Sequence, residues 1–277
     1  MTTDQSAAAM RTFKPFAVEQ FLSESEHGVR FNFSESGVHP MTYRELMDTA
    51  GVDLDALVNE RVDYPQVNGT EELRSRIAAL YRDAESDNVL VTVGATEANT
   101  LVANTLLEPG DNLVCFRPTY EQLLGNALNR GIEVRWVDQL AEQDWALDID
   151  ALNAAVDEQT RVIHVVNPNN PTGRILAAEQ RQALIETARR VGAWIVADEV
   201  YSGTERDTDT PTPSFWGDYE CVVAINSTSK AYGLPGLRLG WAVAPRECID
   251  PMWRRHEYAS IAASHLSMKL TAAALAP

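Results

Sequence analysis

Lysine is scarce in this chain, and acidic residues are in excess. Only three of the 23 basic residues are lysines, against 40 aspartates and glutamates, and the net charge is −17. This charge argues against a nucleic acid as the main partner, because neutralising its phosphates needs clustered Lys and Arg. Since arginine supplies nearly all the positive charge, a lysine at the end of an apolar run, as Lys230 is, suggests a chemical use for its amine.

Cysteines and long apolar runs are also few. Cys115, Cys221 and Cys248 form no C-x-x-C pair, so we expect neither a disulfide framework nor a metal site. Free cysteines fit a reducing, cytoplasmic setting. The first residues lack a basic segment followed by an apolar one, and no apolar run reaches the about 18 residues of a membrane span. We therefore expect neither secretion nor a membrane partner.

What the chain does have is an alternation of short apolar runs and amphipathic stretches. Its 277 residues, 45% of them apolar, can bury a large core. The alternation is typical of an α/β fold with a largely parallel sheet. Seven short runs rich in β-branched residues predict strands at 89–93, 113–116, 134–137, 162–166, 194–197, 222–225 and 241–244.

Two stretches between these runs have helical spacing, 71–82 and 177–191. In the first, Leu73, Ile77 and Leu80 fall on one face, and Thr70 precedes it as the expected N-cap. Residues 1–50 lack the alternation. We therefore expect an N-terminal arm that covers the substrate, followed by a large cofactor-binding domain over residues 51–277.

Four of the predicted strands end in unusually polar segments. In an open α/β sheet, ligands bind outside the carboxyl ends of parallel strands, so these segments should converge on one cleft. They are Gly-Ala-Thr at 94–96, Asn-Pro-Asn-Asn-Pro-Thr-Gly at 167–173, Asp-Glu-Val-Tyr at 198–201 and Asn-Ser-Thr-Ser-Lys at 226–230.

One part of this cleft is suited to a phosphate. Gly94, Ala95 and Thr96 present amide N–H groups at a helix start, an arrangement that binds anions. Ser227 and Arg238 can add a hydroxyl and a bidentate cation to the same anion.

The other polar residues suit an aromatic ring. Asp198 needs a cationic partner if it is buried, and a protonated ring nitrogen would serve. Asn170 and Tyr201 can bind a phenolic oxygen, and Tyr120 can stack on the ring. With the amine of Lys230, this set matches what pyridoxal phosphate requires of a protein.

These motifs resemble those of the class I/II aminotransferases, which are fold-type I pyridoxal-phosphate-dependent enzymes. The matching pieces are the segments at 167–173, 198–201 and 227–230, and Gly-x-Arg-x-Gly-Trp at 236–241, in the family's order and close to its spacing. The resemblance covers about residues 64–244. It implies a three-layer α/β/α large domain with a mostly parallel, seven-stranded sheet.

The resemblance also implies a role for each motif residue. Lys230 is the catalytic residue that holds the cofactor as a Schiff base. The other implied cofactor contacts are Gly94, Ala95, Thr96, Ser227 and Arg238 at the phosphate, Tyr120 on the ring face, and Asn170, Asp198 and Tyr201 at the ring edge. Tyr64 matches the family tyrosine that reaches the phosphate of the neighbouring subunit. A homodimer with shared active sites is therefore implied.

The chain departs from the family pattern at both ends. Members usually continue into a small C-terminal domain whose arginine grips the substrate carboxylate. That domain is absent here, and we expect a truncated chain rather than an enzyme that lacks it. Near the N-terminus, Ser-Gly-Val-His-Pro at 36–40 resembles the arginine-cyclising, capreomycidine-synthase-like branch. Gly37 in this run either contacts the substrate through its backbone or is an ordinary turn glycine.

The leading functional hypothesis is an aminotransferase that acts on an α-amino acid, with a 2-oxo acid as amino acceptor. One alternative is a lyase or cyclase that performs elimination and ring closure on an arginine-like amino acid in specialised metabolism. Another is an inactive cofactor-binding fragment, although the intact catalytic set argues against it.

Overall fold

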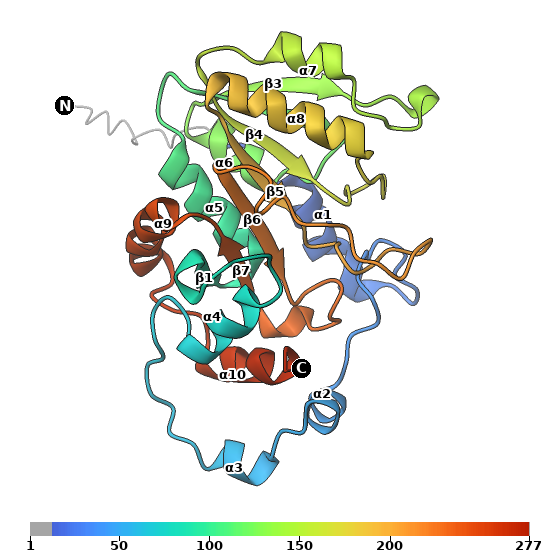
Figure 1. The fold of residues 1–277 in the computed structure, drawn as a ribbon. Coiled ribbons are helices and arrows are strands. Elements are labelled where there is room, and N and C mark those ends of the chain that lie inside the picture. Colours follow the sequence, from blue (N-terminus) through green and yellow to red (C-terminus); the bar gives the residue numbers. More distant parts are fainter. Residues whose placement is uncertain (1–12, 277) are drawn as a thin grey trace, which may run out of the picture.

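The fold is organised around one sheet. A computed structural model of the protein describes residues 13–276. Within them, seven strands pair in the order β1-β7-β6-β5-β4-β2-β3 (Figure 1). The strands are β1 (Val89–Thr92), β2 (Asn112–Arg117), β3 (Glu133–Asp138), β4 (Thr160–Val166), β5 (Trp194–Asp198), β6 (Val222–Ser227) and β7 (Gly240–Val243). β7 is antiparallel to β1 and β6, and the other pairs are parallel. The seven predicted runs and the mostly parallel sheet are confirmed.

Helices cover both faces of this sheet. The α-helices of residues 13–276, of which α1 to α3 precede the sheet and do not cover it, are α1 (Ala17–Ser25), α2 (Tyr43–Ala50), α3 (Leu54–Val58), α4 (Glu71–Ala78), α5 (Gly94–Leu106), α6 (Gln122–Asn129), α7 (Ile149–Ala155), α8 (Ala178–Val191), α9 (Arg246–Ala259) and α10 (His265–Ala274). The longest in the described part, α8 and α9, have 14 residues each. None of the helices within residues 13–276 is long and apolar enough to cross a bilayer.

Alternating side chains of the strands build two separate apolar clusters. In β6, Val222 and Ala224 belong to a cluster that includes residues of α4, α7, α8 and α10, whereas Val223 and Ile225 belong to one that includes residues of α5, α6 and α9. Successive side chains of a strand point to opposite faces, so the two clusters lie on the two sides of the sheet. The predicted three-layer α/β/α arrangement is therefore confirmed.

The helix predicted over 71–82 ends earlier than expected. Thr70 Oγ1 accepts a hydrogen bond from Leu73 N (3.3 Å), which confirms the N-cap. The helix ends at Ala78, and Leu80, predicted on the apolar face, is 50% exposed. Because the chain leaves the helix before this point, Tyr81 takes the buried position, and its hydroxyl accepts a hydrogen bond from Trp241 Nε1 (2.9 Å). The prediction for Leu80 was wrong.

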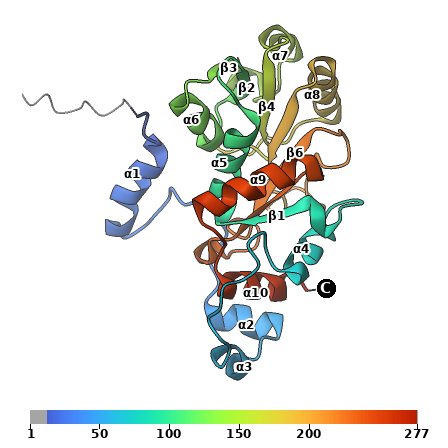
Figure 2. The same ribbon diagram turned by 90° about the vertical axis from the view of Figure 1, so that its left-hand side faces the viewer.

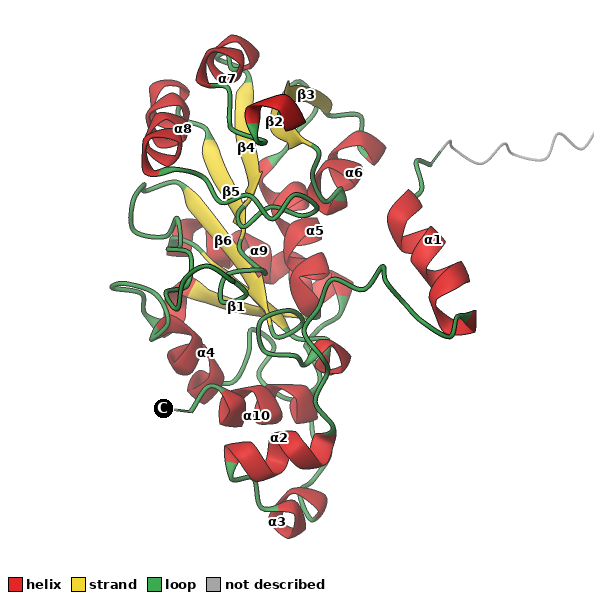
Figure 3. Ribbon diagram, turned by 90° about the vertical axis from the view of Figure 1, so that its right-hand side faces the viewer, coloured by secondary structure: helices red, strands yellow, loops and turns green. Residues whose placement is uncertain are grey.

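The N-terminal helices differ in how they are held. No residue of α1 is buried, and Figures 2 and 3 show this helix set apart from the sheet. By contrast, α2 packs beside α10, where Leu46 and Leu270 share an apolar cluster with Leu234 and Leu237. This cluster joins residues on both sides of position 50. The division into an arm over residues 1–50 and a large domain over 51–277 stays a prediction.

Candidate active site

The polar strand ends converge on one large cavity. It has a volume of about 880 Å³ and lies where the carboxyl ends of β4, β5 and β6 meet the start of α5. Nine of the eleven predicted cofactor-binding residues line it: Ala95, Thr96, Tyr120, Asn170, Asp198, Tyr201, Ser227, Lys230 and Arg238. The parallel strands explain this convergence, because their carboxyl ends share one edge of the sheet.

Three predicted residues lie outside the lining of this cavity. Gly94 begins α5 with φ +70°, and a Cβ added to it would lie 2.5 Å from Arg238 Nη2. Gly37 is half-buried and donates its N–H to Glu35 Oε1 (3.0 Å). Tyr64 is 89% exposed, in the loop before α4. Gly94 thus lies against the side chain of Arg238, which lines the cavity, whereas Tyr64 does not contribute to the cavity of its own chain.

One end of the cavity can hold an anion. The N-cap residue Val93 makes no side-chain cap, and Ala95 and Thr96 of the first turn of α5 line the cavity, so their N–H groups are available to a ligand. Arg238 Nη1 donates to Ser229 Oγ (3.3 Å) and to the carbonyl of Pro235 (2.9 Å). Among residues 13–276, no carboxylate forms an ion pair with Arg238. Its uncompensated charge beside a helix N-terminus fits a phosphate.

Asp198 forms part of the buried floor of the cavity. The side chain is 4% exposed, and burial raises its pKa to about 6. Hydrogen bonds from Val200 N (3.3 Å) and Asn99 Nδ2 (3.2 Å) and the charge of Lys230 lower the pKa without offsetting burial. No basic side chain within the described residues contacts this carboxylate. A cationic group in the cavity would complete its environment.

The amine of Lys230 belongs to a polar network. Its Nζ donates to Ser36 Oγ (3.2 Å) and lies 3.5 Å from Glu35 Oε1. The Tyr201 hydroxyl is 2.7 Å from Ser36 Oγ and accepts a hydrogen bond from Asn170 Nδ2 (3.3 Å). Lys230 Nζ also lies 5.7 Å from the centre of the Tyr201 ring. The amine, the phenol and the amide therefore face one volume, as their spacing after the strands predicted.

Helix α1 provides the outer wall of the cavity. Tyr120 donates its hydroxyl to Glu19 Oε1 (2.6 Å), and its ring lies 5.0 Å from that of Phe16. Burial and this bond raise the pKa of the Tyr120 hydroxyl. The arm is thus attached to the predicted stacking residue.

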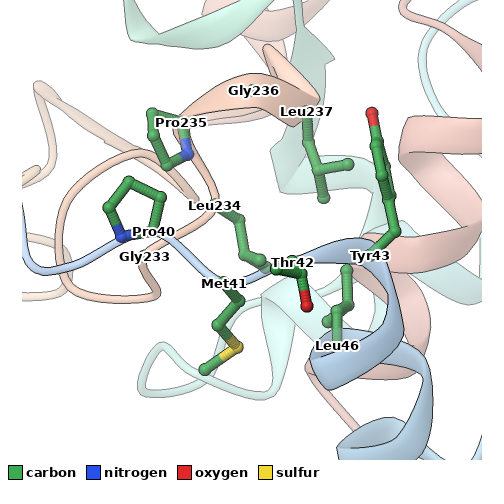
Figure 4. A pocket seen from close by; sticks show the side chains of 10 residues that line it. All are labelled: Pro40, Met41, Thr42, Tyr43, Leu46, Gly233, Leu234, Pro235, Gly236 and Leu237. Carbon is green, nitrogen blue, oxygen red and sulfur yellow. The ribbon is translucent and has the colours of Figure 1, made fainter.

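A second, smaller pocket of about 150 Å³ adjoins the Lys230–Arg238 loop. It lies between residues 40–46 and 233–237, and Figure 4 shows Leu46, Leu234 and Leu237 around it. Met41 N donates to the carbonyl of Gly233 (3.1 Å), which ties the two segments together. Pro235 lines both pockets. None of the predicted site residues lies in the smaller pocket.

Several polar residues of the large cavity that take part in its hydrogen bonds or ion pairs were not predicted as site residues. They are Glu19, Glu35, Ser36, Asn99 and Ser229. A signal for Asn99 was available: it is a polar residue on the apolar face of α5, where Ala98 and Val102 are buried. Ser36 and Glu35 were predicted only as part of the substrate-covering arm and not as site residues, because neither follows a strand.

The residues present fit pyridoxal phosphate. The group combines an anion, a ring nitrogen that can carry a proton and an aldehyde. The cavity offers three matching groups: an arginine at a helix N-terminus that has no carboxylate partner among residues 13–276, a buried carboxylate that no cation contacts in the same part of the chain, and a lysine amine. Each of the three groups of the cofactor therefore has a chemically matching residue in the same cavity.

The same conclusion comes from comparison with known proteins. The family model for aminotransferase class I and II matches residues 48–277. Capreomycidine synthase of Streptomyces vinaceus is 32% identical over 263 residues, which are 93% of this chain and 67% of that protein. A PLP-dependent aminotransferase from Streptococcus suis superposes with a TM-score of 0.89 at 30% identity, covering 96% of this chain and 71% of that one. For the PLP-dependent cyclase OrfR the TM-score is 0.85 at 30% identity, covering 98% of this chain and 70% of that one.

The comparisons also give the share of each relative's length that this chain spans. The chain spans between 36% and 67% of the length of the curated relatives it matches. The relatives of known structure indicate pyridoxal phosphate as the cofactor, in agreement with the cavity. The chain belongs to the class I and II aminotransferases.

Proposed function

We propose that the complete protein is a pyridoxal-phosphate-dependent aminotransferase that moves the amino group of an α-amino acid to a 2-oxo acid. The observation that carries this proposal is the grouping of Lys230, Asp198 and Arg238 in one cavity of about 880 Å³. Each of these three residues can bind a different part of the cofactor.

The cavity residues divide the work of holding the cofactor. When bound, pyridoxal phosphate supplies an aldehyde for covalent attachment of an amino group and a ring that accepts electrons from a broken bond. Arg238, Ser227 and the first turn of α5 would bind the phosphate. Asp198 would keep a proton on the ring nitrogen, because a buried carboxylate is stabilised by an adjacent positive charge.

Lys230 would attach the cofactor and move protons. Its amine is the one nucleophilic nitrogen among the cavity side chains. The other side-chain nitrogens belong to the permanently charged Arg238 and to the amides of Asn99 and Asn170, which are not nucleophilic. The amine, when free, would carry a proton from or to the substrate's α-carbon as general base and acid. Tyr201 and Asn170 would hold the ring oxygen beside it.

Shared active sites in a homodimer are part of this proposal. Tyr64 is 89% exposed and does not line the cavity of its own chain, as expected of a side chain that serves a neighbouring subunit. Mixing a Tyr64→Ala variant with a Lys230→Ala variant tests this. Each is expected to be impaired alone, and the hybrid dimer should regain activity at its one intact site. No recovery after verified subunit exchange would contradict sharing. A cytoplasmic location stays a prediction.

Product analysis of the complete protein tests the reaction itself. We would incubate it with a panel of amino acids, with and without 2-oxo acid acceptors, and identify products by mass spectrometry. Aminotransferase activity predicts a new 2-oxo acid and a new amino acid that appear together and only when an acceptor is added. A protein that binds the cofactor yet forms no product in any combination would support the inactive alternative.

A lyase or cyclase is a second candidate, and one feature of the cavity favours it. Glu19, Glu26 and Glu35 line the outer part, and Glu35 lies 3.5 Å from the Lys230 amine. With Lys230 holding the cofactor, Glu35 would lose this partner and keep the hydrogen bond from Gly37 N, so that it could bind a guanidinium, which pairs with a carboxylate in bidentate fashion. Capreomycidine synthase and the cyclase OrfR are also among the proteins similar to this chain. A cyclised product formed from an arginine-like substrate without any acceptor would identify this activity.

A further inference from the structure

A buried asparagine lies beside Asp198 on the floor of the cavity. Asn99 is in α5, five residues after Gly94, and is 1% exposed. Its neighbours on the buried face of the helix, Ala98 and Val102, are apolar. Burying an amide in such surroundings is unfavourable unless its hydrogen bonds are made. The position therefore requires an explanation.

The amide of Asn99 has a single favourable orientation. Its Nδ2 donates to the carbonyl of Ala95 (3.1 Å) and to Asp198 Oδ2 (3.2 Å). Exchanging the amide nitrogen and oxygen would place the oxygen against two acceptors, so the contacts fix the assignment. Asn99 Oδ1 has no hydrogen-bond partner within the described residues. The amide oxygen of Asn99 is therefore unpaired in this part of the chain, whereas both of its N–H groups donate hydrogen bonds.

Asp198 has few other contacts that could orient it. Its Oδ1 accepts a hydrogen bond from Val200 N (3.3 Å), so the two carboxylate oxygens have one donor each. Among residues 13–276, Asn99 is the one side chain that is hydrogen-bonded to this carboxylate. The other titratable groups that act on Asp198 or respond to it are Lys230, Glu199 and Tyr120.

We propose that Asn99 is a positioning residue, which fixes the orientation of the Asp198 carboxylate and connects it to the helix whose first turn faces the phosphate site. The inference rests on the proposed cofactor-dependent function. Helix α5 then holds both ends of the site, the phosphate end through Gly94 to Thr96 and the ring end through Asn99. Because the helix is rigid, it sets the separation between these two ends.

Titration of Asp198 in the cofactor-free, complete protein tests the proposal independently of activity. Carbon-13 NMR of aspartate-labelled protein, with the signal assigned by Asp198→Asn, follows this carboxyl directly. Without the Asn99 donor, the ionised form loses a hydrogen bond, so Asn99→Leu should raise the pKa of Asp198 further. Asn112→Leu is the matched control, because Asn112 is also fully buried and donates to an aspartate, Asp157 (2.9 Å), outside the cavity. It should leave the Asp198 titration unchanged.

The cofactor-loaded protein gives a second measurement. Asn99→Leu should lower kcat by about 10- to 100-fold, the effect of losing one hydrogen bond to a charged group, with little change in KM for the amino acid. Asn99→Ser, which keeps a donor, should recover part of the loss. Should Asn99→Leu fail to fold, Asn99→Ala removes the amide without adding volume and serves in the same comparison.

The outcomes separate this inference from the proposed function. An unchanged Asp198 titration in the Asn99 variants, or an equal change in Asn112→Leu, would overturn the positioning role. If the Asp198 titration moves as expected but no amino acid is converted by the unsubstituted protein, the positioning role stands and the proposed reaction fails.

Discussion

The floor and the outer wall of the cavity are built in different ways. The floor residues Asn99, Asp198 and Ser227 are at most 4% exposed and lie at strand ends or on a helix packed against the sheet. The wall is formed by α1, which has no buried residue, and by the exposed residues 34–36. Packing holds the floor, whereas a few side-chain bonds hold the wall. Substitutions in the floor should therefore have much larger effects than substitutions in the wall.

The largest effect is expected from Lys230→Ala. Loss of the amine removes covalent attachment of the cofactor and the proton carrier, so activity should fall by about 10³-fold or more. The visible absorption of the attached cofactor should disappear. Lys269→Ala is the matched control, because Lys269 pairs with Glu60 outside the cavity. An unchanged spectrum in Lys230→Ala would refute the assignment of Lys230.

Asp198→Asn should separate function from stability on the floor. A neutral amide cannot hold a proton on the ring nitrogen, so kcat/KM should fall by about 10²- to 10³-fold. Stability should change in the opposite direction. The pKa of Asp198 is about 6 in the folded protein, against 3.8 for an ordinary aspartate, because burial disfavours its charge.

The sign of the pH dependence follows from this difference. The folded protein holds the Asp198 proton more tightly than the unfolded chain, so Asp198 lowers stability as pH rises from about 4 to 6. Above pH 6 this cost is constant, at about 3 kcal/mol. As pH rises from about 4 to 6, denaturant unfolding of the cofactor-free proteins should therefore show the free energy of unfolding of Asp198→Asn increasing relative to that of the unsubstituted protein. A difference that does not vary with pH would contradict the buried, unpaired state of the carboxylate.

Gly94→Ala should produce an intermediate effect at the phosphate end. The backbone there has φ +70°, and the new Cβ would lie 2.5 Å from Arg238 Nη2. Backbone strain and displacement of Arg238 together should weaken cofactor binding by about 10-fold, measured by equilibrium titration. Gly192→Ala is matched in strain, because Gly192 has φ +71° and no atom lies within 4 Å of the added Cβ. Equal cofactor affinity in the two variants would show that Arg238 moves aside freely.

The same contrast explains what could be predicted from the sequence. The strands and the motif residues that follow them were predicted, because apolar runs mark the core and polar residues just beyond each run lie at the sheet edge. The contacts of the wall could not be predicted in this way. Tyr120 bonds to a residue 101 positions away, and Tyr201 to one 165 positions away, with no strand to position either partner. Asn99 is a different case: it was missed although its polar side chain on the apolar face of α5 was a signal, because it follows no strand and its partner Asp198 is 99 positions away.

The smallest effect is expected from Ser36→Ala in the wall. Ser36 Oγ connects the Tyr201 hydroxyl (2.7 Å) with Lys230 Nζ (3.2 Å), but it is exposed and water can replace it. We expect kcat/KM to fall by less than about 10-fold, the effect of one uncharged hydrogen bond. Ser34→Ala is the control, because Ser34 also lines the cavity but its hydroxyl donates only to Asn32 Oδ1 (2.7 Å). A loss of kcat/KM in Ser36→Ala as large as that in Asp198→Asn would show that solvent does not replace the missing hydroxyl. The wall would then orient the Lys230 amine as firmly as the floor orients Asp198.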